Sequence, residues 1–537
     1  MTHTPKPANE PNLSFAPGTP ERDALQAAIK AQAAKVEEIP LRIGGEAVHT
    51  RDTREFTAPH NHQLKLGVHA NAGEAEIARA IQAAQAARPG WAALSVEARA
   101  SVFLRAAELL SGPWHQRINA ATVLNQSKTA HQAEIDAVGE LCDFLRFNAH
   151  YATQLADGQP FSPAGQWNRL ETRPLDGFVY AITPFNFTAI AGNLPSAPAL
   201  MGNTVLWKPS PNAMLSGHLL MELFREAGLP DGVINFVPGD AVAITKQVLA
   251  HEDFAGLHYT GSTAVLRSLF RQVGENMERY RCYPRIVGES GGKDFIVAHP
   301  TADIEQLAVA VLRGAFEYQG QKCSAVSRLY IPRSLWPELE KRVVGMIAEL
   351  KVGDPADFKT FLGAVISRTA YDKISGYIDL AKKDAGCRIV AGGKSDDSKG
   401  FFVDPTLIEV KDPKHKLMHE EIFGPVCSAW VYDDADFEGA VKLCNETSAY
   451  ALTGAVFARD RDVIEFASRE LSHAAGNFYI NDKPTGSIVG QQPFGGARLS
   501  GTNDKAGSAL NLMRWASPRV IKESFNAPRD WRYPFLG

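Results

Sequence analysis

The sequence predicts an α/β protein with a doubly wound parallel sheet and a second α/β domain, and three observations lead to this class. The chain has 537 residues, more than one compact core usually accommodates, so two or three domains are expected. Short apolar strands alternate with helical patterns through residues 177–287, which is typical of βαβ units. Polar segments with glycine or proline follow these strands, at the edge where parallel sheets bind ligands.

The region before these strands is expected to be an arm followed by helices. Residues 1–20 are polar and rich in proline, and we interpret them as an extended N-terminal arm. Residues 21–156 are rich in Ala, Leu, Glu and Gln with helical spacing of the apolar positions. The clearest helices are 101–110 and 132–147, and the second has apolar residues on several faces, which predicts a buried helix. Residues 157–170 are polar and predict a loop or a protruding ribbon.

The expected strands fall into two groups. Those of the first sheet are residues 177–182, 204–207, 233–237, 256–259 and 285–287, with helical patterns at 213–227 and 241–250 between them. Those of the second α/β region are 295–298, 327–331, 427–432, 454–458 and 477–480. The tail from Ala516 contains one strand-like segment and then an aromatic-rich end. This end is equally compatible with packing on a neighbouring subunit and with packing on its own domain.

Composition and charge exclude several classes of protein. The net charge is −4 with acids and bases interspersed, so no nucleic-acid or polybasic membrane surface is indicated. Six cysteines without a C-x-x-C pair indicate neither a disulfide framework nor a zinc site, and no metal is expected. Residues 180–206 are apolar, but their prolines and asparagines favour a buried core over a membrane span. The N-terminus has no apolar h-region and no arginine before Arg22, so we expect a cytoplasmic protein.

Short motifs mark the strand ends and the second half of the chain. No G-x-G-x-x-G follows the first strand, which argues against an ordinary Rossmann dinucleotide loop. The segments after the first five strands are TPFNF (183–187), WKPS (207–210), PGD (238–240), YTGS (259–262) and GESGGK (288–293). They are followed by GQKCS (320–324), HEEIFGPV (419–426) and PFGG (493–496).

In order and spacing, these motifs resemble the aldehyde dehydrogenase superfamily over nearly the whole chain. The resemblance implies the aldehyde dehydrogenase fold: a doubly wound NAD-binding domain, an α/β catalytic domain and a small oligomerisation element. The implied boundaries are 21–156 and 174–288 for the NAD-binding domain, 289–487 for the catalytic domain, and 157–173 with 488–537 for the oligomerisation element and tail. A homo-oligomer, at least a dimer, is therefore expected, and its size is left open.

The resemblance also assigns catalytic residues, and the chemistry explains their types. Oxidation of an aldehyde by hydride transfer requires a tetrahedral carbon, which a thiolate supplies by adding to the carbonyl. Cys323 is implied to be this nucleophile; the plain alternative is an inert buried cysteine. The Asn186 amide and the Cys323 N–H would bind the oxyanion, although Asn186 alone is equally typical of a turn. Glu289, flanked by glycines, would be the general base for thioester hydrolysis, the alternative being an exposed loop residue.

The implied cofactor is NAD. Lys208 and Ser210 would lie near the adenosine ribose, and Ser262 would open a helix whose N–H groups receive the pyrophosphate. The cofactor-binding set is Thr183, Pro184, Phe185, Lys208, Ser210, Gly239, Asp240, Gly261, Ser262, Glu421 and Phe423. Pro211 stands three residues after Lys208, where many NAD-preferring members carry glutamate, so the preference for NAD over NADP is left open.

Three segments resemble the 1-pyrroline-5-carboxylate dehydrogenase branch of the superfamily: residues 9–25, 132–152 and 483–505. The implied reaction converts L-glutamate γ-semialdehyde to L-glutamate with NAD⁺ through a cysteine thiohemiacetal and thioester, the second oxidation of proline catabolism. Another semialdehyde dehydrogenase and a non-catalytic protein that retains the fold are the rival hypotheses. The chain has no room for an additional proline-oxidising barrel of about 250 residues. Docking to a separate proline dehydrogenase is left open.

The expected substrate site is built around a turn that suits a carboxylate. Gly486 and Ser487 would present N–H and hydroxyl donors to it, with Ser324 as a further donor. Glu140 would meet the α-ammonium, with Glu134 as the rival acid and a structural ion pair as the plain alternative. The complete substrate-binding set is Glu140, Phe185, Lys322, Ser324, Gly486, Ser487 and Phe494, in which the two phenylalanines would clamp the aliphatic part.

Overall fold

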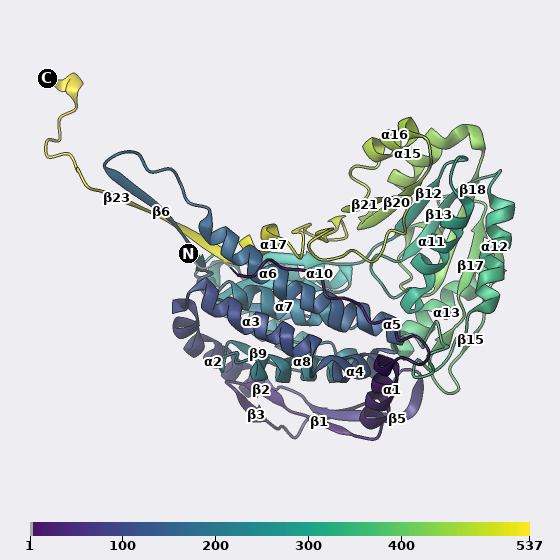
Figure 1. The fold of residues 1–537 in the computed structure, drawn as a ribbon, viewed down its shortest axis with the longest axis horizontal. Coiled ribbons are helices and arrows are strands. Elements are labelled where there is room, and N and C mark those ends of the chain that lie inside the picture. Colours follow the sequence, from purple (N-terminus) through teal and green to yellow (C-terminus); the bar gives the residue numbers. More distant parts are fainter. Residues whose placement is uncertain (1–3) are drawn as a thin grey trace.

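The structure is a computed structural model that describes residues 4–537. Two seven-stranded sheets dominate it, one in each half of the molecule. Figure 1 shows the first sheet with its helices in purple to teal and the second in green, while a two-stranded ribbon projects away from both. The predicted α/β class is confirmed.

The first sheet has the strand order β11-β10-β7-β8-β9-β2-β3, and its first five strands are parallel. Its strands are β2 (Leu41–Ile43), β3 (Glu46–Val48), β7 (Phe178–Ile182), β8 (Thr204–Lys208), β9 (Ile234–Phe236), β10 (Phe254–Thr260) and β11 (Arg285–Glu289). Both faces are covered by helices, so β7 and β8 are almost continuously apolar, as buried parallel strands require.

Helices cover the two faces of this sheet in separate clusters. Val179 and Trp207 face α3, α6, α7 and α8, whereas Tyr180 and Leu206 face α2, α9 and α10. The helices of this half are α1 (Pro20–Ala33), α2 (Glu74–Ala93), α3 (Val96–Ser111), α4 (His115–Gln126), α5 (Ala130–Ala133), α6 (Leu141–Asp157), α7 (Thr188–Leu200), α8 (Met214–Glu226), α9 (Ala241–Leu249) and α10 (Thr263–Glu275). Trp515, from the end of the chain, is fully buried in the first cluster, and its carbonyl accepts a hydrogen bond from Asn203.

The second sheet has the order β14-β17-β18-β13-β12-β20-β21 and is parallel except for its edge strand β14. Its strands are β12 (Asp294–Ala298), β13 (Val326–Pro332), β14 (Cys387–Ala391), β17 (Thr406–Val410), β18 (Val426–Tyr432), β20 (Thr453–Phe457) and β21 (Asn477–Ile480). The helices of this half are α11 (Ile304–Phe316), α12 (Trp336–Glu349), α13 (Arg368–Lys383), α14 (Lys416–His419), α15 (Phe437–Thr447) and α16 (Arg461–Glu470). The chain then returns to the first half, where α17 (Ala509–Met513) packs.

The prediction of a mostly helical segment at 21–156 is wrong between residues 37 and 70. Besides β2 and β3, this part forms β1 (Glu37–Ile39), β4 (Thr53–Ala58) and β5 (Asn61–Ala70), and β1, β5 and β4 make a separate three-stranded sheet. β5 alternates polar and apolar residues near its start, a strand pattern that the alanine-rich flanking helices obscured.

The predicted helix at 132–147 is interrupted. α5 passes into a π-helical turn, η1 (Glu134–Glu140), before α6 begins at Leu141. Such turns are rare and shift the side chains that follow around the helix axis. This turn decides which acids of the segment face outward from the helix bundle.

A buried ion pair lies beside the π-helical turn. Lys128 and Asp136 are fully buried, and the Lys128 ammonium lies 2.6 Å from the Asp136 carboxylate. The same carboxylate accepts the N–H groups of Thr188 and Ala189 at 2.9 and 2.8 Å, which fixes the first turn of α7. The Lys128 ammonium also lies 4.3 Å from the centroid of the Phe187 ring. The pair therefore holds the segment between β7 and α7 in place.

The predicted ribbon consists of β6 (Gln166–Pro174) and β23 (Ala516–Ser524), which pair antiparallel along their full lengths. Figure 1 shows the ribbon extending from the body of the molecule with the aromatic tail beyond it. Phe161, Trp531 and Phe535 are exposed by 83, 81 and 83%. Among residues 4–537, no helix is both long enough and apolar enough to cross a membrane.

Breaking the Lys128–Asp136 pair should destabilise the fold strongly. Asp136→Asn or Lys128→Met leaves one charge buried without its partner, which costs about 3–5 kcal/mol. Thermal and urea unfolding, followed by circular dichroism, measures the loss. Lys65→Ala removes the exposed pair with Glu55 and serves as the control, with a far smaller effect. Equal stability of the Asp136 and Lys65 variants would contradict the assignment.

Candidate active site

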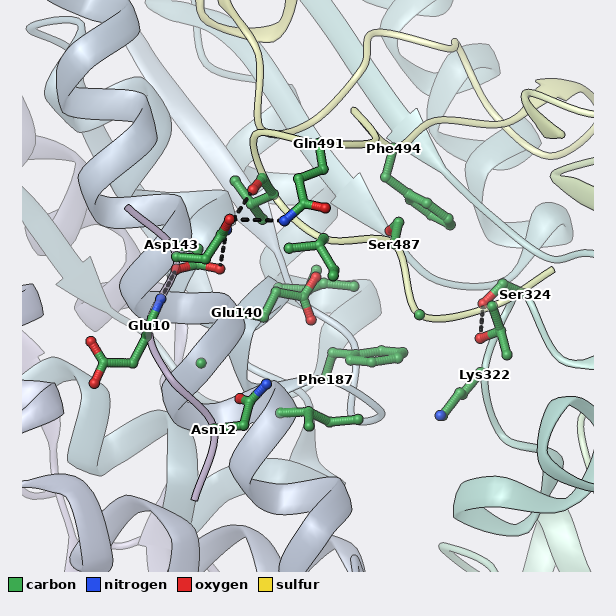
Figure 2. A pocket seen from close by; sticks show the side chains of 18 of the residues that line it. Glu10, Asn12, Glu140, Asp143, Phe187, Lys322, Ser324, Ser487, Gln491 and Phe494 are labelled. Atoms are coloured by element: carbon green, nitrogen blue, oxygen red, sulfur yellow. Dashed lines mark hydrogen bonds between the residues drawn. The ribbon is translucent and has the colours of Figure 1, made fainter. Parts of the chain in front are cut away.

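A cavity of about 330 Å³ lies between the two halves of the molecule. Its walls come from four places: the N-terminal arm, the π-helical turn with α6, the segment around Cys323 and the loop after β21. Figure 2 shows Glu140, Phe187, Ser487 and Phe494 around this space, with Lys322 and Ser324 on the opposite side. Segments far apart in the sequence therefore meet at one thiol.

Cys323 lines the cavity, in the segment between α11 and β13. The glycines of GESGGK allow two stretches of backbone to meet there, because a β-carbon at Gly292 would overlap the carbonyl oxygen of Cys323. Burial raises the pKa of the Cys323 thiol well above its usual range, and the carboxylates of Asp294, Glu289 and Glu421 raise it further. The protein alone thus favours the neutral thiol.

Glu289 is the last residue of β11 and belongs to the GESGGK motif. Its carboxylate accepts the N–H of Gly496 at 2.8 Å. Burial raises the pKa of Glu289 well above its usual range, and the Gly496 hydrogen bond opposes this shift only in part. The charge of Glu289 contributes to the raised pKa of Cys323.

Asn186 is 3% exposed and is tied to the nucleophile segment. Its amide donates to the carbonyl of Gln321 at 3.1 Å, two residues before Cys323. An amide nitrogen has two N–H groups, so one remains free to donate to an oxyanion. The Asn186 carbonyl oxygen is buried and has no hydrogen-bond partner among the described residues.

The two candidate acids of the π-helical turn separate clearly. Glu140 lines the cavity, and Figure 2 shows its side chain directed into it. Glu134 is fully buried elsewhere, where it accepts hydrogen bonds from His115, Asn119 and the N–H of Leu13. Burial raises the pKa of Glu140 to about 8, helped by Asp136 and opposed by Lys128. A cationic partner in the cavity would favour the ionised form of Glu140.

The other predicted substrate residues lie on the cavity wall with one exception. Lys322, Ser324, Gly486, Ser487 and Phe494 line it. The Lys322 ammonium pairs with Glu317 at 3.0 Å, the Ser324 hydroxyl lies 2.8 Å from that of Thr485, and the backbone of Gly486 is left-handed, at φ +89°. A glycine suits that φ, and the turn directs its donors toward the cavity.

Phe185 is the exception. It does not line the cavity, and its ring instead packs edge-on against Phe423 at 6.0 Å between centroids. Phe187, two residues on, lies on the cavity wall in its place. The chain turns after β7, so strand alternation does not determine which phenylalanine faces the thiol. The prediction that Phe185 contacts the substrate is therefore wrong, because its ring does not line the cavity.

Three residues of the arm, Asn9, Glu10 and Asn12, also line the cavity, and sequence reasoning missed them. His131 and Asp143 were missed as well. The resemblance of residues 9–25 to the pyrroline-carboxylate branch was a signal that this segment matters. It gave no location, because the arm forms neither helix nor strand before α1.

The predicted cofactor residues gather at the carboxyl ends of the first sheet. Ser262 caps α10, whose first turn has no acidic residue, so its N–H groups can receive an anion. Burial lowers the pKa of Lys208 to about 8, and Asp240 opposes the shift. Gly239 has a φ of +152°, and a β-carbon there would lie 3.0 Å from the backbone nitrogen of Ala72, so glycine suits this position. These residues fit a dinucleotide with an anionic pyrophosphate.

A second group of predicted cofactor residues lies nearer to the thiol. Glu421 accepts the N–H of Gly292 at 2.9 Å, and Phe423 has a left-handed φ of +61° that turns its ring onto Phe185. Thr183 accepts a hydrogen bond from the Trp207 indole at 3.0 Å. The remaining members, Pro184, Ser210 and Gly261, belong to the loops after β7, β8 and β10.

One group of possible metal ligands occurs among the described residues, on other elements: Asp384, Cys387 and His415. His415 uses Nδ1 to accept the N–H of Leu417, so Nε2 carries the proton and donates to Asp384 at 3.2 Å. The nitrogen that faces Cys387 and Asp384 therefore has no free lone pair for a metal. This cluster lines no part of the cavity.

Similar proteins support one branch of enzymes. The chain is 50% identical over 530 residues to delta-1-pyrroline-5-carboxylate dehydrogenase, mitochondrial, of Bos taurus, covering 98% of this chain and 94% of that one. The Homo sapiens protein of the same name is 49% identical over 536 residues, covering 100% and 95%. The NAD-bound crystal structure of delta-pyrroline-5-carboxylate dehydrogenase from Mycobacterium tuberculosis superposes with a TM-score of 0.97 at 51% identity, covering 100% and 99%.

The cytoplasmic location expected from the sequence is contradicted by these relatives. The proteins from Bos taurus, Homo sapiens and Mus musculus are named mitochondrial. The expectation rested on the absence of a recognisable targeting segment, and such an absence does not indicate a compartment.

The match to a known family extends over most of both halves. The model of the aldehyde dehydrogenase family matches residues 47–520, which include the five parallel strands of the first sheet, the whole second sheet, Cys323 and Glu289. The site geometry and the full-length relatives lead to the same family. This chain belongs to the aldehyde dehydrogenase family.

Proposed function

We propose that this chain oxidises L-glutamate γ-semialdehyde, formed when 1-pyrroline-5-carboxylate opens by hydration, to L-glutamate with NAD⁺. This reaction is the second oxidation of proline catabolism. The observation that carries the proposal is the cavity, which combines the Cys323 thiol with Glu140 and the Gly486–Ser487 turn. The full-length similarity to the dehydrogenases of that name supports the same substrate.

The chemistry begins at Cys323. Its thiol passes its proton to water, and the thiolate sulfur attacks the aldehyde carbon while the carbonyl electrons move to oxygen. The N–H of Cys323 and the free amide N–H of Asn186 donate to this oxygen, which stabilises its charge. Lys208, Ser210 and Ser262 would hold NAD⁺, which would supply the hydride acceptor for the tetrahedral carbon, so that a thioester on Cys323 would remain.

Hydrolysis of the thioester is the task we assign to Glu289. In its ionised form the carboxylate removes a proton from water, whose oxygen attacks the thioester carbon; the C–S bond breaks and glutamate leaves. The buried position of Glu289 raises the pKa of its carboxyl, so its ionised form is a stronger base than an exposed glutamate.

Two groups in the cavity match the charged end of the substrate. The Gly486–Ser487 turn offers N–H and hydroxyl donors to the α-carboxylate, and Lys322 and Lys483 also line the cavity. Glu140 offers a carboxylate to the α-ammonium. Phe187 and Phe494 line the same cavity and can pack against the aliphatic part of the substrate. A substrate with both charges is therefore favoured over a simple aldehyde.

The division of labour between the sheets is part of the proposal. We assign NAD binding to the first half, through Lys208, Ser210 and Ser262, and catalysis to the second half. The β6–β23 ribbon and the tail are assigned to a homo-oligomer of at least two copies. The projecting ribbon and the exposed aromatic side chains of Phe161 and Phe525 support this assignment.

Replacing the nucleophile should abolish turnover. Cys323→Ala is expected to lower kcat at least about a thousandfold, since the covalent route is lost. The measurement follows NADH formation from 1-pyrroline-5-carboxylate, succinic semialdehyde and propanal. Cys282→Ala, a half-buried cysteine outside the cavity, should keep wild-type activity. Preference of the wild type for succinic semialdehyde would overturn the substrate, whereas undiminished turnover by Cys323→Ala would overturn the mechanism.

Replacing the base should trap the thioester. Glu289→Gln is expected to form about one NADH per active site in a rapid burst and then to turn over about 10²–10⁴ times more slowly than wild type. Mass spectrometry of the quenched enzyme should detect the acyl adduct on Cys323. In the wild type, hydrolysis should accelerate as pH rises, because a carboxyl with a raised pKa loses its proton only at higher pH. Sustained wild-type turnover by Glu289→Gln would exclude this role.

The two acids of the π-helical turn should behave differently when neutralised. Glu140→Gln is expected to raise KM for glutamate semialdehyde about 10- to 100-fold, because a charge-assisted hydrogen bond is lost. KM for propanal should change far less. The wild-type KM should also fall as pH approaches 8, where Glu140 ionises.

Glu134→Gln is the matched control for Glu140. It should lower the melting temperature, because Glu134 accepts three hydrogen bonds in the core, and should leave the selectivity between the two aldehydes intact. A selectivity loss in Glu134→Gln rather than Glu140→Gln would reverse the assignment.

A further inference from the structure

The N-terminal arm takes a fixed course across the helices of the first half, although the arm itself forms neither helix nor strand. Between Thr4 and Phe15 it follows the helices η1 and α6, as Figure 1 shows for the purple segment. Its contacts are specific: the Leu13 N–H donates to Glu134 at 2.9 Å, and Phe15 is buried against Phe358. The arm is therefore part of the folded structure.

Asn9 makes three side-chain hydrogen bonds that connect two walls of the cavity. Its amide nitrogen donates to the Asp143 carboxylate at 2.7 Å and to the carbonyl of Val489 at 2.8 Å. Its amide oxygen accepts from the Gln491 side chain at 3.0 Å. Asp143 belongs to α6, whereas Val489 and Gln491 belong to the loop after β21.

Asp143 is held to the arm by a second bond. Its carboxylate accepts the Glu10 N–H at 2.7 Å, and the Glu10 side chain pairs with Arg146, one turn further along α6, at 2.5 Å. The two consecutive arm residues therefore grip one face of the helix. Figure 2 shows Glu10 and Asp143 beside Glu140, with Gln491 across from them.

These bonds join the two groups that we assign to the charged end of the substrate. Asp143 lies three residues after Glu140, and Val489 lies two residues after Ser487. The loop itself has left-handed glycines at Gly486 and Gly490, with φ of +89° and +83°. A loop with two glycines loses more conformational entropy when it is ordered, so an external contact that orders it in advance favours binding.

We propose that Asn9 is a specificity-determining positioning residue, which locks the Gly486–Ser487 turn at the correct separation from Glu140. The proposal rests on the function proposed above, because it concerns the same substrate. Asn9 acts through Asp143, Val489 and Gln491. Its removal loosens the binding of the two charges on the α-carbon and leaves the thiol chemistry in place.

The decisive variant is Asn9→Asp, which keeps the size of the side chain and replaces two N–H donors by a carboxylate. That carboxylate faces the Asp143 carboxylate and the Val489 carbonyl, so the contact becomes repulsive. KM for glutamate semialdehyde should rise roughly tenfold or more, with kcat near the wild-type value. The ratio of kcat/KM for glutamate semialdehyde to that for propanal should fall by the same factor.

A second variant separates a positioning role from a loss of folding. In Asn9→Asp combined with Asp143→Asn, the donor and acceptor of the bridge are exchanged, because the amide introduced on α6 can donate to the carboxylate introduced on the arm. In this double variant, KM should fall most of the way back to the wild-type value. Ser14→Ala, on the same arm but outside the cavity, is the matched control and should match the wild type, since its hydroxyl only accepts the Ala16 N–H.

The outcomes distinguish this proposal from the one on which it rests. If the wild type does not prefer glutamate semialdehyde over propanal, the proposed function fails. If the wild type has this preference and Asn9→Asp keeps it at an unchanged melting temperature, the positioning role of Asn9 is wrong. A rise of KM in Asn9→Asp that the additional change Asp143→Asn does not reverse would also overturn the proposal, because the hydrogen bond between Asn9 and Asp143 would then not be the cause.

Discussion

The buried pair of Lys128 and Asp136 is the contact on which the active site depends. Asp136 binds the first N–H groups of α7, so it sets the path of the preceding Asn186–Phe187 segment. Lys128 lies under the rings of Phe187 and Tyr318, at 4.3 and 4.4 Å, and Tyr318 leads to Cys323. One ion pair thus fixes the segment of Asn186, a cavity wall and the approach to Cys323, which explains why so costly a charge is buried there.

Much of the fold was predictable because its strands follow simple rules. Buried parallel strands are continuous apolar runs, and all ten expected strands appear within a few residues of their predicted positions. Cys323 and Glu289 could be named because the GQKCS and GESGGK motifs resemble those of the aldehyde dehydrogenases, and the resemblance implies their roles. Phe187 and Glu140 depended on local geometry: a turn after β7 for the first and a π-helical turn for the second. Neither turn produces a periodic pattern of apolar residues that could be recognised in the sequence. The residues of the arm show no such pattern either.

Burial is the common cause of the unusual acidities in the site. It raises the pKa of Cys323, Glu289 and Glu140 in the same direction, which favours the neutral forms before the substrate arrives. A dry cavity also strengthens every later interaction with charge. The substrate brings an ammonium and a carboxylate into this setting, so its binding and the ionisation of Glu140 are coupled.

The return of the chain end to the first sheet has a consequence for biosynthesis. Trp515 is fully buried in the core between β10 and α7, packed on the His258 ring at 4.7 Å, and Asn203 binds its carbonyl. The first half therefore lacks part of its interior until residues beyond 515 have left the ribosome. The nascent first half must wait through the translation of the entire second half with an open apolar surface. Chaperone capture during elongation, rather than after release, is the expected safeguard for such a discontinuous domain.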